Sequence, residues 1–156
     1  MPDDEHDKAG VVAPPPLIYL GFLAVGLLLN RRFPVGSLPR GIARGLGWPL
    51  LGGGALLLGW FERAMRRADT PASPYKPVEH IATGGPFRYT RNPGYLSMAM
   101  IYAGIATIAN ALWALLLLPV ALLAIRRGVI EREEDYLERK FGEEYLRYKA
   151  RVRRWI

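Results

Sequence analysis

The sequence of 156 residues contains no cysteine and only two histidines. The lack of cysteine excludes disulfides, thiolate nucleophiles and metal sites built on sulfur. His6 and His80 are isolated histidines, and neither has the neighbouring ligands that a metal site requires. No catalytic triad of serine, histidine and aspartate can be identified in the sequence. We therefore expect no metal, and we assign no catalytic residue.

Charge is missing from three long stretches, residues 14–30, 45–61 and 92–125, which hold no Lys, Arg, Asp or Glu. Hydrophobic residues make up 51% of the chain, and a soluble domain of this size seldom has so much uncharged sequence. The net charge is +7. Beside such apolar stretches, this basic excess favours contact with an anionic membrane surface over nucleic acid. The composition therefore predicts an integral membrane protein that does not bind nucleic acid.

The uncharged stretches predict an all-α protein with about four transmembrane helices and a cytosolic C-terminal helical segment. We expect a disordered acidic tail at 1–13 and a single domain at 14–156. Within this domain, 14–61 would hold two membrane helices, at 17–30 and 46–61, separated by a loop at 31–45. The segment 62–92 is rich in Pro, Gly and Arg and would form a cytosolic connector. Glycines 52–54 would let a neighbouring helix approach closely.

The third stretch is too long for one membrane helix. Its 34 residues would extend about 51 Å as a helix, whereas the hydrocarbon core is about 30 Å thick. We therefore expect a short helical hairpin at 93–127, with the turn at Asn110 and cytosolic helices at 128–156. In this topology 17 of the 21 Lys and Arg lie on one side, which places both termini and the connector in the cytosol.

The first candidate binding segment precedes the hairpin. Asn92 and Pro93 suit the start of a helix, whose free N–H groups attract anions. Arg88 and Arg91 add positive charge, while Tyr89 and Tyr95 add aromatic faces that attract cations. Such a site suits a zwitterionic ligand. The alternative is a collar of Arg and Tyr at the membrane interface.

The second candidate segment follows the hairpin. Apolar residues recur there at helical spacing and define one face: Ile130, Leu137, Phe141, Tyr145, Tyr148, Val152 and Trp155. Glu134 lies within this face and Glu133 beside it. A carboxylate on an apolar face that packs against the membrane helices must form an ion pair or have a functional role. Two alternatives stay open for Glu134, a ligand contact and a structural salt bridge to Arg88 or Arg91. Gly142 would end the helix after Phe141.

Two motifs in this order resemble the isoprenylcysteine carboxyl methyltransferase and phospholipid methyltransferase superfamily of membrane enzymes. The first is Arg91-Asn92-Pro93-x-Tyr95, and the second is Glu133-Glu134 followed by Phe141-Gly142, Tyr145, Tyr148 and a final Arg154-Trp155. The resemblance covers about residues 70–156. It implies S-adenosylmethionine as the cofactor, in a pocket formed by the last two membrane helices and the cytosolic segments around them. It implies cofactor contacts from Arg91, Asn92, Pro93, Tyr95, Glu133, Glu134, Tyr145 and Tyr148. We expect Arg88 and Tyr89 to contact the cofactor too, because of the positive charge and the aromatic face noted above.

Two positions depart from the superfamily pattern and bear on the substrate. Asn92 stands where the isoprenylcysteine enzymes have histidine, and Arg153 stands where many relatives have proline. The resemblance implies a methyltransferase that acts on a lipid or lipid-like acceptor, of isoprenoid or phospholipid type, which enters from the bilayer. The alternatives are a membrane reductase that uses NADPH and a non-catalytic scaffold or lipid-binding protein. The acceptor, the methylated atom, the oligomeric state, the placement of 31–45 and a chemical role of Asn92 stay open.

Overall fold

The computed structural model describes residues 9–36, 38–71 and 75–156. These residues form helices and no strand, which confirms the all-α prediction. The helices follow one another as α1 (Pro15–Arg32), α2 (Arg40–Arg67), the 3₁₀ turn η1 (Gly85–Arg88), α3 (Pro93–Ile108), α4 (Leu112–Ile125), the π-helical turn η2 (Arg126–Ile130), α5 (Glu131–Phe141) and α6 (Glu143–Arg151). The predicted disordered tail lies largely outside the described residues.

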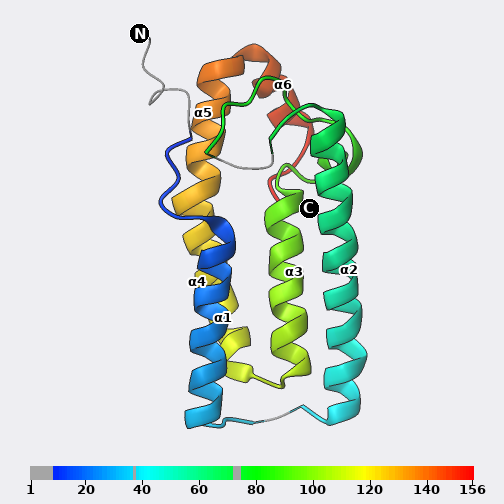
Figure 1. Cartoon of the computed structure of the whole chain (residues 1–156), viewed down its shortest axis with the longest axis vertical. Coiled ribbons are helices and arrows are strands. Elements are labelled where there is room, and N and C mark those ends of the chain that lie inside the picture. The colour runs from blue at the N-terminus through cyan, green and yellow to red at the C-terminus, as the bar shows by residue number, and fades with distance from the viewer. Residues whose placement is uncertain (1–8, 37, 72–74) are drawn as a thin grey trace.

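Helices α1 to α4 run side by side along the long axis of the molecule (Figure 1). The connections from α1 to α2 and from α3 to α4 lie at one end. Helices α5 and α6, the segment after α2 and both described termini lie at the other end, as Figure 1 shows. We refer to this second end as the polar end, because the charged residues of α5, α6 and the 88–91 segment belong to it.

Glycines set the distance between α2 and α3. A Cβ atom on Gly104 would lie 2.6 Å from the backbone nitrogen of Leu51, and one on Gly54 would lie 2.9 Å from the Ser97 carbonyl oxygen. Both helices therefore need a residue without a side chain at these contacts. The prediction that glycines 52–54 admit a neighbouring helix is confirmed for Gly54, whereas Gly52 faces open space.

The α3–α4 hairpin turns at Asn110, as predicted. This residue adopts a positive φ of 53°, a conformation that asparagine tolerates better than most residues. Its side chain accepts a hydrogen bond from the Leu38 N–H at 2.9 Å and donates one to the Leu38 carbonyl at 2.8 Å. The turn is thus fixed to the connection between α1 and α2.

The predicted bounds of the second helix are wrong. Helix α2 begins at Arg40 and ends at Arg67, so it takes up part of the predicted loop 31–45 and of the connector 62–92. Arginines and alanines in these stretches favour helix, and the exposed arginines reach water from the ends of the bundle. The second hairpin arm also continues through η2 into α5 without a break, because nothing between Pro119 and Gly142 terminates it.

The end of this long helix agrees with the sequence. Gly142 has a φ of 51°, which favours glycine, and the helix stops at Phe141. Among the described residues, the helix Leu112–Phe141 is the one that is long and apolar enough to cross a membrane, and α3 is a shorter apolar helix. The four membrane spans therefore remain a prediction.

Candidate functional site

A cavity of about 360 Å³ lies at the polar end. This volume falls within the range of about 300–1,000 Å³ that is common for small-molecule sites. Its lining comes from distant parts of the chain, namely the start of α1, the end of α2, the segment after it, the start of α3, α5 and α6. The apolar part of the lining includes Phe61, Met65, Phe87, Met98 and Leu137.

Arg91 contributes a buried positive charge to this cavity. Its side chain is 9% exposed, and its Nη2 atom lies 3.2 Å from Glu134 Oε1. Its Nε and Nη1 atoms are buried and have no hydrogen-bond partner among the described residues. Buried polar atoms normally have hydrogen-bond partners, and these two nitrogens would gain one from a water molecule, an ion or a ligand in the cavity. The two atoms of Arg91 can bind an anionic group such as a carboxylate.

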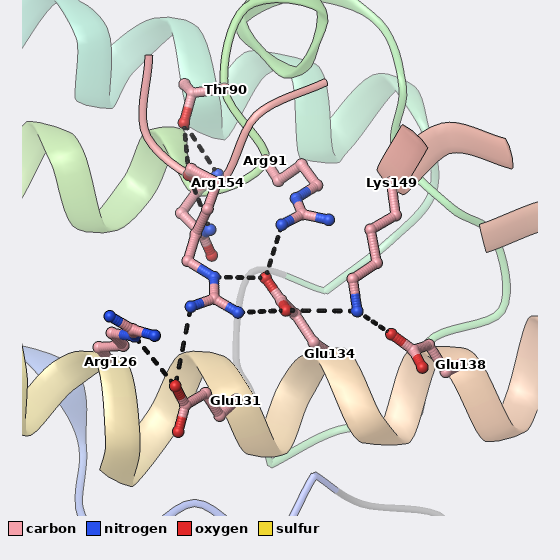
Figure 2. A network of polar contacts seen from close by, with 9 residues as sticks. Thr90, Arg91, Arg126, Glu131, Glu134, Glu138, Lys149 and Arg154 are labelled. Carbon is pink, nitrogen blue, oxygen red and sulfur yellow. Dashed lines mark hydrogen bonds and ion pairs between the residues drawn. The ribbon is translucent and has the colours of Figure 1, made fainter. Parts of the chain in front are cut away.

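Glu134 is the centre of an ion-pair network (Figure 2). Arg154 donates from Nε to Oε1 at 3.0 Å and from Nη2 to Oε2 at 2.8 Å, and Lys149 Nζ lies 3.8 Å from Oε2. Lys149 also pairs with Glu138. Of the two alternatives for Glu134, the structure shows the salt bridge. Of the two arginines predicted as its partner, Arg91 and not Arg88 forms the contact. Both carboxylate oxygens are therefore engaged by protein groups.

Glu133 differs from its neighbour. It lines the cavity, and its Oε1 atom accepts a hydrogen bond of 2.7 Å from the Tyr95 hydroxyl. The pKa of Glu133 is raised to about 7, chiefly by burial; the hydrogen bond from Tyr95 lowers it and the charge of Glu134 raises it. Because no salt bridge of Glu133 is found in the described part of the chain, this carboxylate is the one available to a cationic group in the cavity.

Two buried tyrosines of α6 complete the polar lining. The Tyr148 hydroxyl donates to the Phe87 carbonyl at 2.8 Å, and the rings of Tyr145 and Tyr148 lie 6.2 Å apart. Burial raises the pKa of both tyrosines, so both remain neutral at physiological pH. Neutral aromatic rings can attract a cation through their faces without introducing a competing charge.

The C-terminal segment holds the start of α3 in place. The Arg154 carbonyl accepts hydrogen bonds from Thr90 Oγ1 and Asn92 Nδ2, each at 3.0 Å, and the Arg91 N–H donates to the Arg153 carbonyl at 2.9 Å. Asn92 occupies the N-cap position of α3, but its side chain makes no capping bond there. The side chain of Asn92 therefore holds the C-terminal segment instead of capping the helix as its type suggested.

Most of the predicted site residues meet in the cavity. Its lining includes eight of them: Arg91, Asn92, Pro93, Tyr95, Glu133, Glu134, Tyr145 and Tyr148. Arg88 and Tyr89 are exposed and lie outside this lining, with the Tyr89 ring 6.2 Å from that of Trp60.

The structure adds residues to which the sequence assigned no role. Arg154 and Lys149 reach Glu134, and Phe61 and Met65 of α2 form part of the cavity wall. Of these residues, only Arg154 belongs to a recognisable sequence motif, the terminal Arg-Trp pair. The side chains of α2 reach the site through helix packing, and no sequence motif indicates such packing.

The sequence model of the phospholipid methyltransferase family matches residues 42–144. The chain belongs to this family of membrane-associated methyltransferases, which confirms the resemblance drawn from its two motifs. It is also similar to an uncharacterised protein of Haemophilus influenzae, with 48% identity over 63 residues, which is 40% of this chain and 98% of that protein. No solved structure matches the chain significantly.

Proposed function

We propose that the chain is an S-adenosylmethionine-dependent methyltransferase that acts on a lipid or lipid-like acceptor in the membrane. One observation carries this proposal. One cavity combines the Glu133 carboxylate and apolar walls with two guanidinium nitrogens of Arg91 that have no partner among the described residues. Membership of the phospholipid methyltransferase family supports the reaction class.

The polar groups of the cavity match a zwitterionic cofactor. Arg91 would bind the carboxylate through Nε and Nη1, and Glu133 would bind the ammonium group. The neutral faces of Tyr145 and Tyr148 would lie near the sulfonium. When bound, this cofactor supplies a methyl group on a positively charged sulfur. The protein then has to position the acceptor and exclude water, and these tasks need no side-chain nucleophile.

The apolar lining supports a lipid-like acceptor. Phe61 and Met65 from α2, Met98 from α3 and Leu137 from α5 all line the cavity beside the charged groups. An apolar chain can pack against these side chains while its reactive head group lies near the polar residues. We propose that the acceptor enters from the bilayer and the cofactor from the cytosol.

The surface of the bundle supports a membrane location. Large apolar side chains are exposed along α1, α2 and α4, where water would disfavour them: Leu17, Leu20, Val25, Leu28, Leu46, Trp48, Leu56, Leu116, Val120 and Leu123. We propose that α1 to α4 cross the membrane, with both termini and the cavity on the cytosolic side. The positive residues support this orientation, because 16 of the 20 lysines and arginines among the described residues belong to the polar end and its flanking segments.

Cofactor binding can be tested with the full chain purified in detergent. Calorimetric titration with S-adenosylmethionine and S-adenosylhomocysteine should give saturable binding, and NADPH should give none. Saturable NADPH binding instead would favour the reductase alternative. Absence of binding for all three would favour a non-catalytic scaffold and would refute the proposed activity.

The reaction itself can be tested in membranes. Membranes that contain the chain are incubated with methyl-labelled S-adenosylmethionine, and lipids and peptides are analysed by mass spectrometry. We expect the label in a lipid fraction, and Arg91→Ala should remove it. Label in soluble small molecules only would contradict a lipid-like acceptor.

A further inference from the structure

Three positively charged side chains surround the single carboxylate of Glu134. Arg91, Arg154 and Lys149 all lie within 4 Å of Glu134, at 3.2, 2.8 and 3.8 Å. Arg154 makes the two-pronged contact that matches a guanidinium to a carboxylate, since its Nε and Nη2 atoms engage one oxygen each. Arg91 contacts the same carboxylate through Nη2 alone.

The single contact of Arg91 has a consequence for the cavity. With Arg154 across both oxygens of Glu134, Arg91 cannot form its own two-pronged pair there. Its Nε and Nη1 atoms have no partner in the part of the chain that the structure describes, although the side chain is only 9% exposed. Figure 2 shows one nitrogen of Arg91 joined to Glu134, while no interaction is marked for the other two.

We propose that Arg154 is a positioning residue that occupies Glu134 and thereby keeps Arg91 available to the carboxylate of a ligand in the cavity. This inference rests on the proposed function for the identity of the ligand. Without the Arg154 guanidinium, the Glu134 carboxylate attracts Arg91 into a two-pronged pair. One of the two nitrogens that would bind the ligand is then engaged by Glu134, and the remaining one can no longer grip a carboxylate with two hydrogen bonds.

The backbone fixes the distance between the two arginines. Thr90 Oγ1 and Asn92 Nδ2 donate to the Arg154 carbonyl, and the Arg91 N–H donates to the Arg153 carbonyl. The C-terminal segment therefore runs directly beside Arg91, and the Arg154 side chain reaches Glu134 from there (Figure 2). Its third nitrogen, Nη1, lies 3.7 Å from Glu131, which further orients the guanidinium.

The decisive test compares a single and a double variant in cofactor binding. Arg154→Ala should weaken S-adenosylmethionine binding about tenfold, the scale of one charge-assisted contact. Adding Glu134→Gln to Arg154→Ala removes the carboxylate that captures Arg91, and should return the affinity to within about threefold of wild type. Arg154→Lys should lie between wild type and Arg154→Ala, because an ammonium neutralises Glu134 without the two-pronged geometry.

The matched control is Arg153→Ala. Arg153 is exposed and uses its backbone carbonyl in the contact with Arg91, so loss of its side chain should leave binding unchanged. If Arg154 merely supported the fold, the double variant would bind as weakly as the single variant or more weakly. That result, or unchanged binding in Arg154→Ala, would overturn the proposal.

A second measurement does not depend on the cofactor. Phenylglyoxal modifies accessible guanidinium groups, and peptide mass spectrometry can quantify its reaction at Arg91. The reaction should be slower in Arg154→Ala than in wild type and should recover in the double variant. Equal rates in all three proteins would refute the positioning role. Failure of wild type to bind S-adenosylmethionine would instead refute the proposed function, so the two failures are distinguishable.

Discussion

The helical bundle and the polar end of this protein are held together by different interactions. Between α2 and α3, backbones come into contact at Gly54 and Gly104, where a single added carbon has no space. At the polar end, the chain is held by ion pairs around Glu134 and by hydrogen bonds to the C-terminal segment. The stability of the bundle should therefore depend on the size of the side chains between its helices, and that of the polar end on the charge of its side chains. Four experiments test this difference, in decreasing order of the change that we expect.

Glu134→Gln should destabilise the protein by about 3 kcal/mol, because it leaves buried Arg91 and the arginine and lysine beside it without their shared counter-charge. Thermal unfolding in detergent measures the loss. Asp135→Asn is the control, since Asp135 is exposed on the same helix and should change stability by about 0.5 kcal/mol or less. Equal losses in the two variants would show that the polar end does not depend on this charge.

Gly104→Ala should destabilise the bundle by about 2 kcal/mol, because the new Cβ would lie 2.6 Å from the Leu51 backbone nitrogen and the helices would have to separate. Gly52→Ala adds the same atom where nothing lies within 4 Å, and should be neutral or slightly stabilising, since alanine favours helix. The two variants are compared by thermal unfolding. A larger loss for Gly52→Ala would contradict the packing that sets the α2–α3 distance.

Arg91→Ala should weaken S-adenosylmethionine binding about thirtyfold, because it removes the donors expected to bind the carboxylate. Glu134 keeps Arg154 and Lys149 as partners, so the fold should persist. Arg88→Ala, which changes an exposed arginine outside the cavity lining, should alter affinity less than twofold. Titration calorimetry compares them, and an equal effect of both changes would favour a general surface charge over a specific contact.

The affinity for S-adenosylmethionine should depend on pH through Glu133. Its pKa is raised from 4.5 to about 7, so the carboxylate charge that attracts an ammonium is present above pH 7 and lost below it. Affinity should fall up to about tenfold between pH 8 and pH 6, and Glu133→Gln should remove the dependence. The same shift means that the contribution of this group to folding stability is complete below about pH 4.5 and is lost as the pH rises through 7. A pH profile unchanged in Glu133→Gln would assign the titration elsewhere.

Much of the fold could be predicted from the sequence because its signals are local. Uncharged stretches of sufficient length predict helices, Asn110 predicts the hairpin turn, and Gly142 predicts the end of the long helix. The boundaries of α2 and the continuity of α4 with α5 could not be predicted in this way. A change from apolar to charged residues indicates a change of environment, and a helix can continue through it.

The candidate site could also be predicted in part from the sequence. Most of the residues that the two motifs predicted line the cavity, because each motif lies on one continuous segment. They could not distinguish Glu133 from Glu134, since adjacent carboxylates have identical chemistry until their surroundings are known. They also gave no role to Arg154, although it makes the strongest contact to Glu134.

From the amino-acid sequence alone it follows that this protein is helical, where its hairpin turns, and which two segments carry the motifs that resemble its family. The three-dimensional packing was needed to show which glutamate pairs with arginines and which has a tyrosine hydroxyl as its partner, and that α2 and the C-terminal segment help to build the site. The two kinds of property differ because they depend on contacts over different separations along the chain. Helix formation depends on neighbours within a few residues, whereas the availability of a charged group depends on partners such as Arg91 and Arg154, which lie far from Glu134 along the chain.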